Sequence, residues 1–333
     1  MIPLLVCDDS NMARKQLIRA LPAEWPVSLS QASNGEEALA LIRQGLGQVM
    51  LLDLTMPVLD GYQTLAALRA EGLKSQVIVV SGDVQEEAVR RVRELGALAF
   101  IKKPADPEIL RQTLIDLKLF APQATPAAQA QAAALAELKV SFRDALREVS
   151  NVAMGRAAAL LAKVLGVFVQ LPVPQVNIFE VSELHMTLLD AQRGERFSAI
   201  CQGFIGEAIA GEALLLFHDS EVNDMARLLG WQPKNEAETS EMLLDLASIL
   251  IGACLAGIAE QLDLRFSQGH PQLLGQHASI DQLVQVNRQR WHKTLAVEIS
   301  YSLEGHAIHF DLLLLFTEDS IKRLTAKIGY LME

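Results

Sequence analysis

The sequence has few cysteines, no long apolar run and no secretory start. Cys7, Cys201 and Cys254 lie singly in apolar surroundings and form no CxxC pair, so we expect no disulfide framework and a reducing, cytoplasmic compartment. The longest uncharged apolar run, Leu246–Ala259, has 14 residues. This is fewer than the about 20 that cross a bilayer, which predicts a buried core helix and no membrane insertion. The N-terminus, MIPLLVCDDS, lacks the basic region and cleavage site of a signal peptide.

Positive charge is also scarce. The chain holds 29 basic and 40 acidic residues, a net charge of −11, which disfavours non-specific binding to nucleic acids or anionic membranes. The residues after position 120 carry −9 of this charge and include no basic recognition helix, so a DNA-binding regulator is not expected. The sequence contains no Gly-rich phosphate loop, no Ser-His-Asp arrangement and no zinc-ligand spacing.

A length of 333 residues, half of them apolar, predicts two folded domains. In the first 120 residues, apolar runs alternate with stretches of helical spacing. The apolar runs are Leu4–Cys7, Val49–Leu52, Val77–Val80 and Ala97–Ile101, and the helical stretches are Asn11–Leu21, Glu36–Gln44, Tyr62–Ala70, Glu86–Leu95 and Pro107–Leu119. Apolar strands separated by helices are typical of a parallel sheet buried on both faces. We therefore predict an α/β domain over residues 1–120, doubly wound on five parallel strands.

Residues 121–137 form an Ala-rich linker. Nine of the sixteen residues from 121 to 136 are alanine and none is charged. Thr125 followed by Pro126 is a helix-start signal, and the Ala/Gln stretch after it favours a helix that continues towards Leu165. A disordered tether is the alternative, and the sequence leaves both open.

The second domain, residues 138–333, contains an internal repeat. The segment LREVSNVAMG at 146–155 aligns without gaps with LLDLASILIG at 243–252, and residues 213–230 align with 312–329. Each later segment is an apolar strand, a polar turn and an amphipathic helix. Residues 199–204 and 295–302 alternate as strands of an antiparallel sheet with one covered face do. We predict a pseudo-symmetric α+β domain with long helices packed on one sheet.

Polar residues in the first domain follow the predicted strands. Asp8 and Asp9 follow the first strand, Asp53 follows VMLL, Ser81 follows VIVV, and Lys103 follows the last strand. Function gathers at the carboxyl ends of the strands in an open parallel sheet. Three carboxylates at that edge repel one another unless a divalent cation lies between them, and oxygen ligands suit Mg²⁺. A phosphoryl group on Asp53 would be held by metal, hydroxyl and ammonium groups.

Residues 1–120 resemble the receiver domain of two-component response regulators. The motifs that carry this resemblance are LVCDDS, LLDLTMPVLDG, VVSGD and FIKKP. The resemblance implies that Asp53 accepts phosphate from a histidine kinase, while Asp8 and Asp9 help to bind Mg²⁺.

The resemblance also implies roles for three other residues. Ser81 would contact the phosphoryl group, Phe100 would be the aromatic switch residue, and Lys103 would be the phosphate-binding lysine. The neighbouring Lys102 would point to the opposite face of the strand.

A second candidate site lies on the first helix of the second domain. Glu148 and Asn151 are three residues apart and share a helical face. Ser150, Asn151 and Gly155 are residue types with low helix propensity. Several residues that disfavour the local structure, close together, often mark a functional site. An acyl phosphate mainly needs a positioned water, which the Asn151 carboxamide could orient. Glu148 could pair with the phosphate-binding lysine of a docked receiver.

Residues 138–333 resemble the CheC/CheX/FliY family of chemotaxis phosphatases. The family pattern is E-x-x-N, an apolar residue, and a glycine four positions after the asparagine; Glu148, Asn151, Val152 and Gly155 match it. The resemblance implies hydrolysis of the aspartyl phosphate of a chemotaxis response regulator.

The second copy of the repeat departs from this pattern. It has Asp245 and Ser248 at the positions of Glu148 and Asn151. Asp is one methylene shorter and Ser lacks the amide, and misplacement by about 1 Å can reduce a rate about a hundredfold. We therefore predict one working site and a degenerate second site.

The sequence supports two functions. The first is a response regulator that is phosphorylated on Asp53 and dephosphorylates either a CheY-like regulator or itself, alone or across a homodimer. The alternative is a non-catalytic interaction protein in which phosphorylation switches the assembly of a degenerate CheC-like module.

Overall fold

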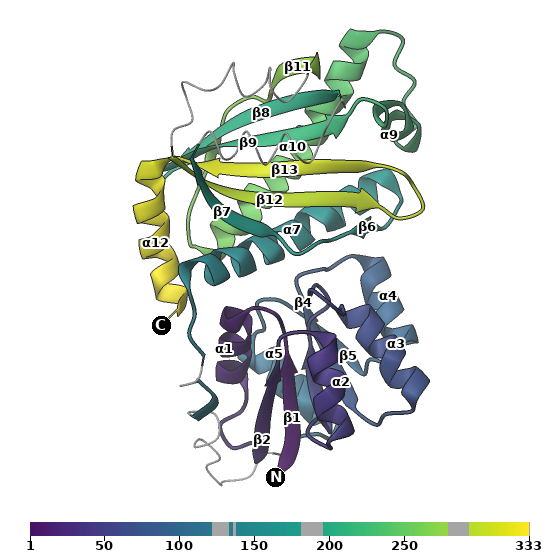
Figure 1. Cartoon of the computed structure of the whole chain (residues 1–333), viewed down its shortest axis with the longest axis vertical. Helices are drawn as coiled ribbons and strands as arrows, with labels where there is room; N and C mark the ends of the chain where they lie inside the picture. The colour runs from purple at the N-terminus through teal and green to yellow at the C-terminus, as the bar shows by residue number, and fades with distance from the viewer. Residues whose placement is uncertain (122–132, 136–137, 181–195, 279–292, 333) are drawn as a thin grey trace. The chain divides into compact units, whose positions relative to one another are not determined.

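The computed structural model describes residues 1–121, 133–135, 138–180, 196–278 and 293–332. The chain forms two compact units (Figure 1), the first comprising Met1–Glu148 with Met332 and the second comprising Val149–Leu331 with Glu333. The division falls inside one long helix. The boundaries that we derived from the sequence, at residues 120 and 137, remain predictions.

The first unit is built on a five-stranded parallel sheet with the order β2-β1-β3-β4-β5. Its elements are β1 (Ile2–Cys7), α1 (Asn11–Ala20), β2 (Val27–Ala32), α2 (Gly35–Arg43), β3 (Val49–Leu52), α3 (Gly61–Glu71), β4 (Gln76–Ser81), α4 (Glu86–Glu94), β5 (Ala99–Lys102) and α5 (Pro107–Asp116). The predicted α/β fold with a doubly wound parallel sheet is confirmed.

Both faces of this sheet are covered by apolar side chains. In β1, Leu4 and Val6 belong to the core cluster that includes residues of α1 and α5. The alternate residues Leu5 and Cys7 belong to the cluster that includes residues of α2, α3 and α4. Because successive strand residues point to opposite faces, a strand buried on both sides must be apolar throughout.

Side-chain caps begin α1, α2, α3 and α5, whereas α4 begins without one. Ser10 and Asn34 cap α1 and α2, and Asp60 forms a capping box with Gln63 at α3. Asp106 caps α5, which has Pro107 in its first turn. These caps satisfy backbone N–H groups that have no partner within the helix, and they fix each helix start beside a strand end.

Gly61 allows α3 to start close to the loop after β3. A Cβ atom at this position would lie 2.3 Å from the carbonyl oxygen of Asp53 and 2.8 Å from the Cα of Leu54. We expect Gly61→Ala to lower the free energy of unfolding by about 1–3 kcal/mol, because backbone would have to shift. Urea denaturation measures this loss. Gly329→Ala is the matched control, since a Cβ there meets nothing within 4 Å.

The helix at the division between the units, α7, begins at Phe142 and ends at Leu165. Residues 138–141 are not helical, so the continuous helix from Pro126 to Leu165 that we considered is wrong. The Ser141 hydroxyl accepts a hydrogen bond from the N–H of Asp144 at 3.1 Å, which caps the new helix start. Most of the Ala-rich linker, residues 122–132 and 136–137, lies outside the described residues.

The second unit is built on an antiparallel sheet. The strand order is β10-β8-β9-β13-β12-β6. In addition, β11 pairs with β8 and β7 pairs with β12. After α7 the elements are β6 (Val169–Gln170), β7 (Gln175–Glu180), β8 (Phe197–Gly206), β9 (Ile209–His218), α9 (Val222–Leu228), α10 (Glu236–Gln261), β10 (Ser267–Gln268), β11 (Gln272–Ala278), β12 (Lys293–Leu303), β13 (His309–Phe316) and α12 (Glu318–Met332). The predicted α+β class is confirmed.

The repeat appears as a pseudo-two-fold in this sheet. Leu214 and Leu313 occupy equivalent positions in the two copies, and they pair directly where β9 and β13 meet. The first-copy strand β7 pairs with the second-copy strand β12, while the second-copy strand β11 pairs with the first-copy strand β8. Each copy thus completes the sheet of the other, so the repeats form one unit.

Burial in the second unit differs from the sequence-based expectation. Successive residues of β9, Leu214 and Leu215, are 3% and 0% exposed, so the central strands are buried on both faces and not on one.

Helix α10 packs closely against α7. A Cβ atom at Gly257 of α10 would lie 2.8 Å from the Cα of Ala153 of α7, so only glycine fits there without a shift. By length and composition alone α10 is apolar enough to cross a membrane, but 56% of its most apolar window is buried in the fold, and a core helix passes the same test.

Candidate phosphoacceptor site

Three carboxylates converge where β1 and β3 end. Asp8 and Asp9 directly follow β1 and Asp53 directly follows β3, and ligand oxygens from the three lie within 4.8 Å of one another. Asp8 and Asp53 are almost completely buried, and the Asp9 side chain is 7% exposed. The parallel register places the ends of neighbouring strands at the same edge, which is why residues 45 positions apart in sequence meet here.

Lys103 brings the positive charge of this site. Its Nζ atom lies 2.7 Å from Asp8 Oδ2 and 3.3 Å from Asp53 Oδ1. The Lys103 side chain is 4% exposed, whereas Lys102 is exposed, as the alternation of a strand predicts. The structure therefore brings the predicted lysine, and not its neighbour, to the carboxylates.

Ser81 and Phe100 lie nearby in the same sheet. Ser81 ends β4 and is completely buried, and its hydroxyl accepts a hydrogen bond from the N–H of Asp83 at 3.2 Å. Phe100 lies in β5 and packs against the core cluster that includes residues of α2, α3 and α4. Their predicted roles, contact with a phosphoryl group and switching, remain predictions.

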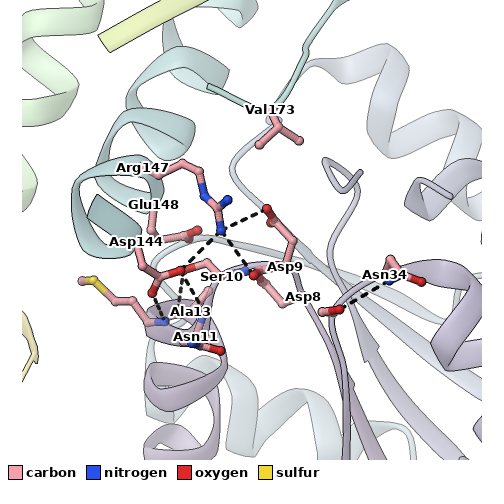
Figure 2. A network of polar contacts seen from close by, with 12 residues as sticks. Asp8, Asp9, Ser10, Asn11, Ala13, Asn34, Asp144, Arg147, Glu148 and Val173 are labelled. Atoms are coloured by element: carbon pink, nitrogen blue, oxygen red, sulfur yellow. Dashed lines mark hydrogen bonds and ion pairs between the residues drawn. The ribbon is translucent and has the colours of Figure 1, made fainter. Parts of the chain in front are cut away.

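The first residues of α7 contact the same edge of the sheet (Figure 2). Phe142–Glu148 belong to the first unit. Within it, Glu148 Oε1 lies 3.1 Å from Lys103 Nζ. Arg147 Nη2 lies 3.3 Å from Asp9 Oδ2. The carboxylate of Asp144 accepts hydrogen bonds from the backbone N–H groups of Asn11 and Met12, at 3.1 and 2.8 Å.

Sequence reasoning identified Glu148 but missed Asp144 and Arg147. Both residues stand on α7 before the E-x-x-N pattern, where charged residues are usual on a solvated helix face. Their partners lie 132 to 138 positions away in the sequence, and no local pattern reports a contact over that distance. Only the charge spacing, an acid and a base three residues apart, could have drawn attention to them.

Burial and charge crowding shift the pKa values of these groups. Burial, and then the nearby carboxylates, raise the pKa of Asp53 well above its ordinary value, although Lys103 opposes the rise. Burial also raises the pKa of Asp9 to about 6 and that of Glu148 to about 7. Burial alone would lower the pKa of Lys103, but Asp53, Asp8 and Glu148 together raise it. The site thus has excess negative charge.

The acidic residues suit a divalent cation. Asp53 Oδ1 and Oδ2, Asp8 Oδ2 and Asp9 Oδ2 are buried, and apart from the ion pairs of Lys103 and Arg147 they have no hydrogen-bond partner among the described residues. Buried carboxylate oxygens without donors are costly unless a cation binds them. The donor set consists only of carboxylate oxygens, which suits Mg²⁺. Asp8, Asp9 and Asp53 are therefore the residues that would hold it.

The remaining predicted residues lie on the two long helices of the repeat. Asn151 follows Glu148 by three residues on α7 and is 6% exposed, and Glu148 is 4% exposed. Their counterparts on α10, Asp245 and Ser248, are both exposed. The two copies thus differ in their surroundings as well as in sequence. The catalytic role of the first pair and the degeneracy of the second remain predictions.

Asp83, beside this site, gives a pH test of the local structure. It is 4% exposed and accepts hydrogen bonds from Gln85 and Tyr62. Burial raises the pKa of Asp83 to about 6, from an ordinary value of 3.8. Because the pKa is higher in the folded protein, protonated Asp83 stabilises the fold at pH values below 3.8. This contribution to stability is lost as the pH rises through about 6.

We therefore expect Asp83→Asn to become more stable relative to the wild type between pH 4 and pH 7. One pKa unit corresponds to about 1.4 kcal/mol, so the relative gain should be about 1–3 kcal/mol. Urea denaturation of both proteins across this range measures it. A difference that stays constant with pH would show that Asp83 does not titrate as described.

The sequence of the first unit matches the family model of the response regulator receiver domain over residues 4–115. This part of the chain is therefore a receiver domain. The match covers about a third of the chain.

The curated relatives share this part of the chain. The probable C4-dicarboxylate response regulator DctR of Priestia megaterium is 38% identical over 119 residues, which cover 35% of this chain and 51% of the relative. The protein-glutamate methylesterase/protein-glutamine glutaminase of Halalkalibacterium halodurans is 37% identical over 129 residues, which cover 36% of this chain and 37% of the relative. The chain thus spans about half or less of these relatives. Among solved structures, FliY of Thermotoga maritima is similar with 18% identity and a TM-score of 0.46, over 58% of this chain and 98% of that one.

Proposed function

We propose that this protein is phosphorylated on Asp53 by a histidine kinase and that helix α7 hydrolyses the aspartyl phosphate of its own receiver domain. The observation that carries this proposal is the ion pair between Glu148 and Lys103, at 3.1 Å. It joins the glutamate of the E-x-x-N pattern to the lysine expected to bind the phosphoryl group. A docking glutamate of a phosphatase helix would make this contact.

The spacing on α7 supports the role of Asn151. Three residues along a helix correspond to a rise of about 4.5 Å and return nearly to the same face. A helix that is held by Glu148 at the lysine therefore presents the carboxamide one turn further on. The amide can donate one hydrogen bond and accept another, so it can hold a water molecule in a fixed orientation.

The reaction is an in-line hydrolysis. The water oxygen forms a bond to phosphorus while the bond between phosphorus and the Asp53 oxygen breaks. Asp53 leaves as a carboxylate, and the proton of the water goes to the departing inorganic phosphate. Lys103 balances charge on the phosphoryl oxygens, and Asn151 orients the water. A bound Mg²⁺ would supply further stabilisation of negative charge.

The ion pair of Glu148 favours the chain's own receiver as the substrate. Glu148 is 4% exposed and pairs with Lys103, so a separate regulator would first have to displace it from that lysine. The chain's own Lys103 already contacts Glu148. A separate CheY-like regulator, or the receiver of a homodimer partner, is the alternative substrate.

A mixing experiment separates these substrates. Phosphorylated Asn151→Ala protein retains the phosphoryl group but lacks the proposed water-orienting amide. Adding unphosphorylated Asp53→Asn protein, which keeps Asn151, should leave the phosphate lifetime unchanged if hydrolysis occurs only within one chain. A shortened lifetime would instead show action between chains. Radiolabelled phosphate release measures both outcomes.

A non-catalytic interaction protein is the second candidate. Asp245 and Ser248 are exposed on α10 and lack the residue types of the phosphatase pattern, so this helix face can contact a partner without performing hydrolysis. Capture of a chemotaxis regulator that depends on Asp53 phosphorylation but not on Asn151 would favour this candidate. Both candidates place the protein in the cytoplasm, where its kinase would act.

A further inference from the structure

The first turns of α7 bring a positive charge to the acidic pair. Arg147 Nη2 lies 3.3 Å from Asp9 Oδ2 and donates a hydrogen bond to the Asp9 carbonyl oxygen, also at 3.3 Å. Asp9 is one of the three carboxylates that suit a divalent cation. Among the described residues, no hydrogen-bond donor satisfies Asp9 Oδ2. Arg147 thus supplies charge to an oxygen that a cation would otherwise bind.

Asp144 holds Arg147 in this position. Arg147 Nη2 donates a hydrogen bond to Asp144 Oδ1 at 3.3 Å. The same carboxylate accepts the backbone N–H groups of Asn11 and Met12, at the start of α1. A carboxylate at a helix N-terminus is favoured by the unpaired N–H groups and by the helix dipole. The segment Asp144–Glu148 is therefore fixed to the receiver at α1, at Asp9 and at Lys103.

This pair differs from an ordinary surface salt bridge. Exposed pairs contribute about 0–1 kcal/mol because water screens both charges. Here the Asp9 side chain is 7% exposed and the Arg147 side chain is 30% exposed. Asp9 also lies in a crowded group of carboxylates, whose repulsion Arg147 reduces. The charge of Arg147 therefore stabilises this group of carboxylates more than it would stabilise an exposed ion pair.

We propose that Arg147 competes with the divalent cation for Asp9, so that cation binding and the Arg147–Asp9 contact oppose each other. Mg²⁺ requires direct oxygen ligands and keeps several of its waters. A guanidinium group only donates hydrogen bonds and cannot share that side of Asp9 Oδ2 with a hydrated ion. Cation binding therefore releases Arg147 from Asp9, and by linkage a docked Arg147 weakens cation binding.

This proposal does not depend on phosphatase activity. It concerns only contacts within the first unit and the affinity of the unphosphorylated protein for a metal ion. A failure of the hydrolysis experiments would leave it unchanged, and its own failure would leave Asn151 as the candidate water-orienting residue.

Titration calorimetry of the full chain with MgCl₂ tests the competition. We expect Arg147→Gln to bind Mg²⁺ about fivefold more tightly or better, in the usual range of coupling between two sites. Arg143→Gln is the matched control, because Arg143 is an exposed arginine on the same helix. It removes the same charge at a distance from Asp9 and should change the affinity less than about twofold. Equal Mg²⁺ affinities of Arg147→Gln and wild type would overturn the proposal.

NMR provides a second test in which Mg²⁺ is titrated into the wild-type protein, so the result does not depend on whether a variant folds correctly. Arginine side chains labelled with ¹⁵N report whether a guanidinium group is held in an ion pair. The signal of Arg147, assigned by its absence from Arg147→Gln, should shift towards that of an exposed arginine as Mg²⁺ saturates the site. An Arg147 signal that stays unchanged at saturation would show that the cation does not displace it, and the proposal would be wrong.

Discussion

Replacing Asn151 by alanine should lengthen the lifetime of the phosphoryl group on Asp53 by about 10- to 100-fold. The proposed carboxamide orients the attacking water, and a misplacement of about 1 Å already reduces rates by about a hundredfold. Uncatalysed hydrolysis of the acyl phosphate would remain, so the phosphoryl group should still be lost slowly. The measurement is release of labelled phosphate after the kinase or a small-molecule donor has been removed.

Ser248→Ala is the control for Asn151→Ala. Ser248 occupies the equivalent position of the repeat on α10 and is exposed, so its loss should leave the lifetime unchanged. Equal lifetimes for wild type and Asn151→Ala would contradict hydrolysis by α7. The non-catalytic interaction protein would then be the better description.

Replacing Lys103 by methionine should lower the free energy of unfolding by about 2–4 kcal/mol at neutral pH without Mg²⁺. Lys103 pairs with Asp8, Asp53 and Glu148, and removing one partner of a buried ion pair typically costs about 3–5 kcal/mol. Protonation of the carboxylates, whose pKa values are already raised at Asp53 and Glu148, should reduce this loss. Urea denaturation monitored by circular dichroism measures it.

Lys102→Met is the control for Lys103→Met, because it removes the same charge from an exposed neighbouring residue. We expect it to change stability by about 0.5 kcal/mol or less. Mg²⁺ should stabilise Lys103→Met more than the wild type, because loss of the ammonium group from Asp8 and Asp53 should tighten Mg²⁺ binding, and a more tightly bound ligand stabilises the folded state more. Similar losses in the two lysine variants would show that Lys103 is not the charge that holds the carboxylates together.

The positions of the receiver residues could be predicted from sequence because parallel strands impose strong constraints. Residues that follow buried strands must gather at one edge of the sheet, which places Asp8, Asp53 and Lys103 together. The apolar runs of β1, β3 and β4 are visible because these strands have little contact with water. The second strand, Val27–Ala32, contains no such run, since it lies at the edge of the sheet and only its end residues are buried.

Contacts of α7 with the receiver could only be found in the structure. The sequence suggests that Glu148 pairs with a receiver lysine, but not that this lysine is Lys103 of the same chain. It gives no indication that Asp144 caps α1 or that Arg147 contacts Asp9. The side chains on each side of these contacts are ordinary polar residues of a helix or a loop.

The sequence alone predicts the receiver fold, the group of charged residues at the carboxyl edge of its sheet and the repeat of the second unit. These features depend on periodic burial and on polar residues at strand ends, which a linear pattern records. The tertiary structure decided the pairing of the two copies at Leu214 and Leu313, and the contacts of Asp144, Arg147 and Glu148 with the acidic site. Such contacts depend on the distance between side chains after folding, because charge and hydrogen bonding act through space and not along the chain.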